Sequence, residues 1–135
     1  MGRNTPSITD AEWAVLERLW QEGPATVRRL ADSLYPKGGA SEYATVHKLL
    51  ERLEAKGYVR RDRREGVYVF RAVVERDAII GQELEALAEK MCGGSLQPLL
   101  MTLLRVKRLK PEELRELLAI VEEFDAKSSR KKPRG

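Results

Sequence analysis

The spacing of apolar side chains predicts three short helices in the first part of the chain. The apolar stripes are Trp13, Leu16, Leu19 and Trp20, then Val27, Leu30, Ala31 and Leu34, then Val46, Leu49, Leu50 and Leu53. Thr9 and Glu12 have the spacing of a capping box before the first helix, and Thr26 and Ser41 are expected to cap the other two. Because both tryptophans belong to the first stripe, we expect them in the core.

After Gly57 the pattern changes to a period of two residues. The stretches "YVRRD" and "GVYVFRA" alternate polar and apolar residues on either side of "RREG", which predicts a β-hairpin with Arg63 and Arg64 at its tip. Three helices followed by a hairpin, with short connections, are typical of a winged helix-turn-helix. We therefore predict such a DNA-binding domain over residues 1–72.

Residues 73–126 are predicted to form three more helices, which are apolar on more than one face. Helices of this kind usually pack against another chain, so we predict a helical dimerisation domain and a fold that is mainly α with a small β-hairpin. The alternative is one intramolecular core shared with the N-terminal part. The expected interface residues are Ile79, Ile80, Leu84, Leu87, Leu99, Leu100, Leu103, Leu104, Leu114, Leu117, Leu118 and Val121.

Charge is distributed unevenly along the chain. Residues 1–72 contain 13 Lys and Arg against 10 Asp and Glu, residues 73–126 contain 7 against 11, and residues 127–135 contain 5 against none. Such asymmetry suggests that only part of the molecule meets a polyanion. Residues 127–135 have no apolar anchor and are predicted to form a basic, flexible tail.

Composition limits the function classes. No stretch approaches the roughly 20 apolar residues that cross a bilayer, and no secretion signal is visible, so we expect a cytoplasmic protein without membrane insertion. Cys92 and His47 are the single cysteine and histidine, which excludes an internal disulfide and a zinc site. Without a nucleophile–base set or a glycine-rich phosphate loop, we expect neither an enzyme nor a cofactor.

The third predicted helix, Ser41–Lys56, takes the place of the helix that enters the major groove of DNA in a helix-turn-helix. Thr45 and Lys48 can reach base edges or the backbone, and Tyr43 and His47 can hydrogen-bond phosphates. The residues expected to contact DNA on this helix and at the start of the second are Thr26, Arg28, Ser41, Tyr43, Ala44, Thr45, His47, Lys48 and Arg52.

The hairpin behind this helix would be the wing. Alternation along the first strand predicts Arg61 and Arg63 on one face and Arg60 on the other. Arg61, Arg63 and Arg64 are expected to hold a DNA phosphate or to enter a minor groove. The helix would then select the sequence while the arginines hold the backbone beside it.

Several stretches resemble one known family. "ITDAEWAVLERLW", "ATVRRLADSL", "YATVHKLLERLEAKGYVRR" and the segment after Val74 are similar to the penicillinase-repressor (BlaI/MecI/CopY-type) family of winged-helix transcriptional regulators, from about Ile8 to Phe124. The resemblance implies homodimers with N-terminal winged helices and a C-terminal helical dimerisation domain. It also implies binding to palindromic operators in double-stranded DNA and repression of genes.

The chain departs from that family at two places. Many members have two threonines at the start of the recognition helix, where this chain has Ala44 and Thr45. Antibiotic-responsive members are cut by a sensor protease at an Asn-Phe bond, and Thr102-Leu103 stands at the corresponding position. The resemblance therefore implies a sensor protease as a candidate partner and Thr102-Leu103 as the candidate switch. The clustered C-terminal cysteines of copper-responsive members are absent, so copper sensing by that route is not expected.

A second function is compatible with the same residues. The winged helix could act as a protein-interaction adaptor that binds no specific operator. Weak, sequence-independent affinity for DNA even at low salt would favour that function over a repressor.

Overall fold

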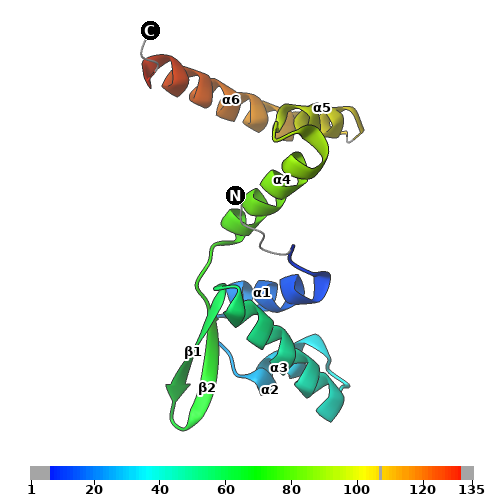
Figure 1. Ribbon diagram of the computed structural model, residues 1–135, viewed down its shortest axis with the longest axis vertical. Coiled ribbons are helices and arrows are strands. Elements are labelled where there is room, and N and C mark those ends of the chain that lie inside the picture. The colour runs from blue at the N-terminus through cyan, green and yellow to red at the C-terminus, as the bar shows by residue number, and fades with distance from the viewer. Residues whose placement is uncertain (1–6, 107, 132–135) are drawn as a thin grey trace. The chain divides into compact units, whose positions relative to one another are not determined.

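The computed structural model describes residues 7–106 and 108–131 of the chain, which form two compact units divided after Leu87. The elements of the described residues, drawn in Figure 1, are α1 (Asp10–Glu22), α2 (Val27–Leu34), α3 (Ala40–Ala55), β1 (Val59–Arg64), β2 (Val67–Ala72), α4 (Arg76–Cys92), α5 (Gln97–Val106) and α6 (Pro111–Lys131). The predicted fold class, mainly α with a small β-hairpin, is confirmed.

The predicted caps of α1 and α2 are present. At α1 the Thr9 hydroxyl accepts a hydrogen bond from the Glu12 amide, and the Glu12 carboxylate accepts one from the Thr9 amide. At α2 the Thr26 hydroxyl accepts from the Arg29 amide. These bonds satisfy amides that the first turn of a helix leaves without partners, so local sequence alone determines where both helices begin.

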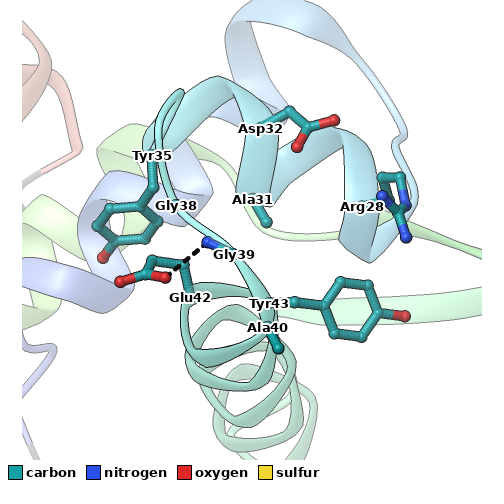
Figure 2. Close-up of a pocket in the computed structure, with 9 residues that line it drawn as sticks. All are labelled: Arg28, Ala31, Asp32, Tyr35, Gly38, Gly39, Ala40, Glu42 and Tyr43. Atoms are coloured by element: carbon teal, nitrogen blue, oxygen red, sulfur yellow. Dashed lines mark hydrogen bonds between the residues drawn. The ribbon is translucent and has the colours of Figure 1, made fainter.

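The prediction that Ser41 caps α3 was wrong, because the helix begins one residue earlier. Gly39 is the N-cap residue, and its amide donates to Glu42 Oε1 at 2.8 Å (dashed in Figure 2). Ser41 lies in the first turn, where its carbonyl accepts a hydrogen bond from the Thr45 hydroxyl at 3.0 Å. The carboxylate three residues after Gly39 thus replaces the expected hydroxyl cap.

The hairpin is an antiparallel pair that runs from Val59 opposite Ala72 to Arg64 opposite Val67. Glu65 and Gly66 form its two-residue turn with φ angles of 50° and 84°, as a type I′ turn requires. The prediction of Arg63 and Arg64 at the tip was wrong. Both arginines belong to β1, because the left-handed turn needs only the two residues that follow them.

One hydrophobic core joins α1, α2, α3, the hairpin and the start of α4. Its buried members are Val15, Leu16, Leu19, Ala25, Val27, Leu30, Ala31, Val46, Leu49, Leu50, Leu53, Tyr58, Val59, Phe70 and Ile79. Trp13 and Trp20, which were predicted to lie in the core, are half-buried at its edge and pack against it with their ring centroids 5.3 Å apart. Trp20 also donates from Nε1 to the Val74 carbonyl at 3.0 Å.

The beginning of α4 belongs to the first unit. Ile79 is fully buried in the core, and the Tyr58 hydroxyl donates to Gln82 Oε1 at 2.9 Å. The prediction of Ile79 as a dimer-interface residue was therefore wrong, because its side chain is already covered within its own chain. The first compact unit extends to Leu87, beyond the boundary predicted after residue 72.

The second unit contains the end of α4 together with α5 and α6. Gly93 and Gly94 follow α4 with φ angles of 62° and 91°, and Pro111 is the first residue of α6, as predicted. Because α6 continues to Lys131, residues 127–131 of the predicted tail are helical, and residues 132–135 lie outside the described chain. Within residues 7–106 and 108–131, no helix combines the length and the hydropathy that crossing a bilayer requires.

A buried ion pair joins α1 to the end of α3. The Glu12 side chain is 2% exposed, and its Oε1 lies 2.8 Å from Nζ of Lys56. Burial alone would raise the pKa of the Glu12 carboxyl, but hydrogen bonds from Lys56 and Thr9 outweigh it and hold the pKa below its ordinary value. The ionised pair therefore fixes the C-terminal end of α3 against the start of α1.

We expect Glu12→Gln to lower the free energy of unfolding at neutral pH by about 2 kcal/mol, because Lys56 loses its anionic partner in a buried site. A carboxyl whose pKa is depressed by folding stabilises the protein above its unfolded pKa, and this contribution is lost as the pH falls through the folded pKa. The difference between wild type and variant should therefore shrink in acid.

Urea unfolding followed by circular dichroism, at neutral and at acidic pH, measures this difference. Glu17→Gln is a matched control on the same helix, because Glu17 takes part in none of the ion pairs found among the described residues. An equal loss of stability at both pH values would contradict the assigned role of the pair.

The connection between α2 and α3 tolerates a side chain at one glycine and not at its neighbour. A Cβ at Gly38 would lie 2.6 Å from Cγ and 2.8 Å from Cβ of Glu42, the residue that caps α3. A Cβ at Gly39 would meet nothing within 4 Å. We expect Gly38→Ala to displace Glu42 and to cost about 1 kcal/mol of stability, the value of a helix cap.

Gly39→Ala is the control for this substitution and should change stability by less than about 0.5 kcal/mol. Urea unfolding of both variants, with circular dichroism as the signal, gives the comparison. Equal losses in the two variants would show that the close approach to Glu42 does not matter.

Candidate nucleic-acid interface

One face of α3 is buried and the opposite face is free. Val46, Leu49, Leu50 and Leu53 pack into the core. The predicted DNA-contacting residues on the other side are exposed, except for the half-buried His47, and these are Ser41, Tyr43, Ala44, Thr45, Lys48 and Arg52. Ser41, Thr45, Lys48 and Arg52 recur every three or four residues, so they form one stripe along the helix. The structure therefore places most of the predicted DNA-contacting residues of α3 on one exposed face.

A shallow hollow lies between α2 and the start of α3. Its volume is about 390 Å³, and it is lined by Arg28, Ala31, Asp32, Tyr35, Gly38, Gly39, Ala40, Glu42 and Tyr43. Figure 2 shows Arg28 and Tyr43 on one side of the hollow, and the Arg28 guanidinium lies 5.9 Å from the centre of the Tyr43 ring. A guanidinium and a phenol side by side at its rim are both hydrogen-bond donors suited to a phosphate.

Thr26 is engaged in capping. Its hydroxyl oxygen accepts the Arg29 amide, so its predicted contact with DNA would have to use the remaining donor of the hydroxyl. His47 lies on the exposed helix, with Nδ1 3.7 Å from Glu51 Oε2 in an i,i+4 pair. The capping role of Thr26 was predicted from the sequence, whereas the contact between His47 and Glu51 was not.

The arginines of the hairpin differ in what they contact. Arg61 is held by Glu54 of α3 through two hydrogen bonds, from Nε at 3.0 Å and from Nη2 at 2.8 Å. Arg63 lies over the Tyr68 ring at 5.2 Å from its centre, and its charge has no carboxylate partner among the ion pairs of the described residues. Arg64 is exposed on the opposite face of the strand.

The paired carboxylates stay ionised. The hydrogen bond from Arg61 lowers the pKa of Glu54, although its partial burial acts in the opposite direction. The hydrogen bond from the Gly39 amide lowers the pKa of Glu42. Both groups therefore act as fixed anions that hold α3 and the hairpin in place, rather than as proton donors or acceptors.

Two features of this surface were missed from the sequence. Glu54 pairs with an arginine across the Gly57 turn, and Tyr68 carries Arg63 on its ring. The register of the hairpin could have revealed the second contact, because Arg63 lies directly opposite Tyr68. The first contact depends on how the hairpin leaves the end of α3, and no local pattern gives that angle.

The face has the chemistry of a polyanion-binding surface. Exposed cations, hydroxyl groups and a phenol can bind phosphates and base edges without any covalent step. In the parts of the chain that the structure covers, no three His, Cys, Asp or Glu side chains gather in a way that could hold a metal.

Apolar side chains are exposed along the other helices. Of the predicted interface residues, Ile80 and Leu99 are half-buried, and the exposed ones are Leu84, Leu87, Leu100, Leu103, Leu104, Leu114, Leu117, Leu118 and Val121. Single exposed apolar residues are ordinary, whereas a series of them on successive helices is typical of interaction surfaces. Thr102 and Leu103, the candidate switch position, are both exposed inside α5.

Comparisons with known proteins agree with this geometry. The family model described as penicillinase repressor matches residues 8–123 of the chain. The transcriptional regulator BlaI of Mycobacterium tuberculosis is 30% identical over 130 residues, which cover 95% of this chain and 92% of that protein. The penicillinase repressor of Staphylococcus aureus is 22% identical over 127 residues, which cover 94% of this chain and 100% of that protein.

A solved structure of a MarR family protein from Bacillus stearothermophilus is similar over 93% of this chain and 78% of that chain, with 25% identity and a TM-score of 0.48. The family match and the relatives confirm the resemblance found in the sequence. Members of the matched family are repressors of transcription and not enzymes. Because the match covers most of its length, the chain belongs to the penicillinase-repressor family of winged-helix transcriptional regulators.

Proposed function

We propose that the protein is a homodimeric repressor that binds a palindromic operator, with α3 in the major groove and the hairpin, here called the wing, on the neighbouring backbone or minor groove. Its family makes it a DNA-binding transcriptional repressor. The observation that carries the finer proposal is the exposed stripe of α3, opposite a fully buried stripe and beside the arginines of the wing.

In this proposal the early residues of α3 select the sequence. Thr45 and Lys48 meet base edges, because they occupy the middle of the exposed stripe and combine a methyl, a hydroxyl and an ammonium group. Tyr43 and Arg28 bind a phosphate at the rim of the hollow. Arg52, a turn further along, contacts the backbone.

The wing supplies affinity that does not depend on sequence. Arg63 and Arg64 lie at the end of β1 next to the turn, and both are exposed. Each phosphate contact by such a cation releases condensed counterions, which makes binding sensitive to salt. Arg61 contributes less directly, since its guanidinium is engaged by Glu54.

Residues 88–126 serve as the dimerisation surface in this proposal, together with Leu84 and Leu87 in the preceding part of α4. The exposed series of leucines on α5 and α6 supports it, because a stable interface needs such an apolar area. A two-fold axis would place two copies of α3 about one helical turn of DNA apart, or a multiple of that distance, which is roughly 10 bp.

The proposed site of action is the cytoplasm, where a repressor would meet its operator. A sensor protease is the proposed partner for induction, with the Thr102-Leu103 bond as its target. Because that bond lies inside α5, a protease would have to unfold this helix locally before cleavage.

Selection of DNA fragments by the purified protein, followed by footprinting, tests the proposal as a whole. We expect enrichment of a palindrome and protection of two half-sites. Binding that is weak and independent of sequence at low salt would favour the adaptor function instead.

We expect Arg63→Ala with Arg64→Ala to weaken binding to every duplex and to reduce the salt slope by about 0.9 for each phosphate that the wing no longer neutralises. Affinities measured at several salt concentrations give this slope. Arg18→Ala is the control, because Arg18 lies on α1 and pairs with Glu22. A slope that stays the same in the double variant would contradict the proposed place of the wing.

We expect Leu118→Glu to raise the dissociation constant of the dimer at least 100-fold, since about 3 kcal/mol accompanies burial of one leucine and a charge is costly there. Leu118 is 56% exposed within its own chain, so the substitution should not unfold the protomer. Analytical ultracentrifugation measures the change, with Glu116→Gln on the same helix as the control. A dimer as tight as the wild type would exclude this surface as the interface.

A further inference from the structure

The carboxylate of Glu54, on α3, binds an arginine of the wing. Both carboxylate oxygens of Glu54 accept hydrogen bonds from the Arg61 guanidinium, at 2.8 and 3.0 Å. Each side chain is about one-third exposed, so the pair is neither free in water nor fully buried. A two-pronged contact of this kind fixes the relative orientation of its partners as well as their distance.

The same guanidinium is fixed from two further directions. Its central carbon lies 4.8 Å from the centre of the Phe70 ring and 5.1 Å from that of the Tyr68 ring. Phe70 belongs to the core and is 1% exposed, so one of these contacts is immobile. Arg61 is therefore anchored to the recognition helix, to the core and to the second strand at once.

The contact with Tyr68 extends this arrangement toward the tip of the wing. The Tyr68 ring lies between two arginines, with Arg63 at 5.2 Å from its centre as well as Arg61 at 5.1 Å. Arg63 and Tyr68 are also direct cross-strand partners. A continuous series of contacts thus runs from Glu54 through Arg61 and Tyr68 to Arg63, the cation proposed to meet a phosphate.

We propose that Glu54 is a positioning residue, which holds the wing at a fixed angle to α3 through Arg61 and thereby increases the preference of the protein for its operator. The inference rests on the proposed function, because it assumes that α3 and the wing contact the same duplex. Neither Glu54 nor Arg61 needs to touch DNA for this effect.

Simple electrostatics gives the opposite expectation for the same residue. A carboxylate close to the DNA-binding face repels phosphates, so its removal should strengthen binding to any duplex. If Glu54 is a positioning residue, its removal should instead weaken binding to the operator. A mobile wing would still attract a polyanion, but it would hold Arg63 in the required place for only part of the time.

Glu51 provides a matched control. It lies one turn earlier on the same helix and is exposed, and its one ion pair within the described part of the chain is the 3.7 Å contact with His47. Glu51→Gln and Glu54→Gln remove the same charge from almost the same place, and only the second breaks the contact with the wing. Arg61→Lys keeps the charge of the wing but cannot make the two-pronged contact.

The experiment compares the full-length variants on two duplexes, the operator selected by the wild type and a scrambled duplex of equal length and composition. We expect Glu51→Gln to shift both affinities by the same factor. In Glu54→Gln and Arg61→Lys the ratio of operator to scrambled affinity should fall about tenfold, as expected when a charged hydrogen bond is removed. Hydroxyl-radical protection of the deoxyribose backbone should weaken where the wing lies and persist on the strands that flank α3.

An unchanged ratio in both Glu54→Gln and Arg61→Lys would overturn the positioning role while leaving the repressor proposal intact. If Glu54→Gln does not fold, Arg61→Lys decides alone. A wild type without any preference between duplexes would overturn the proposed function, and the positioning role with it. Amide hydrogen exchange of the hairpin in Glu54→Gln and Arg61→Lys, measured without DNA, tests separately whether the contact orders the wing. Exchange as slow as in the wild type would overturn the positioning role.

Discussion

The pair of backbone hydrogen bonds between Ala25 and Phe70 attaches the wing to the connection between α1 and α2. The Ala25 amide donates to the Phe70 carbonyl at 3.0 Å, and the Phe70 amide donates to the Ala25 carbonyl at 2.8 Å. The ring of Phe70 is buried in the core at the same point. An isolated two-stranded hairpin is marginal in water, so this attachment makes the hairpin a stable part of the domain.

The recognition surface follows from the same core. Because Leu49, Leu50 and Leu53 are buried, the opposite face of α3 has to point away from the protein. The ion pair of Glu12 with Lys56 fixes one end of that helix, and the bond from the Gly39 amide to Glu42 orders the other. A helix held at both ends can present its side chains to a groove with little loss of conformational freedom on binding.

Local signals in the sequence predicted the helices, the hairpin and most of the exposed face, because caps and periodic stripes act over a few residues. Some errors shifted a boundary by one or two residues, as at the start of α3 and at the hairpin turn. Others came from interactions between distant residues. In the sequence, Ile79 is one of several apolar residues of α4, and only the folded structure shows that the core of the first unit buries its side chain. The partner of Arg61 depends on the angle at which the hairpin leaves α3. The extension of α6 to Lys131 reflects the low cost of adding polar residues to an established helix.

The position of α1 and of the hairpin also has an optical consequence. Both tryptophans and all four tyrosines fall between Trp13 and Tyr68, and the helices after Leu87 contain neither residue type. Intrinsic emission therefore reports on the DNA-binding unit alone, whereas the amide signal of helices reports on both units. Any separation between the two transitions measures directly how far the halves of the molecule melt independently, without a label or a truncated chain.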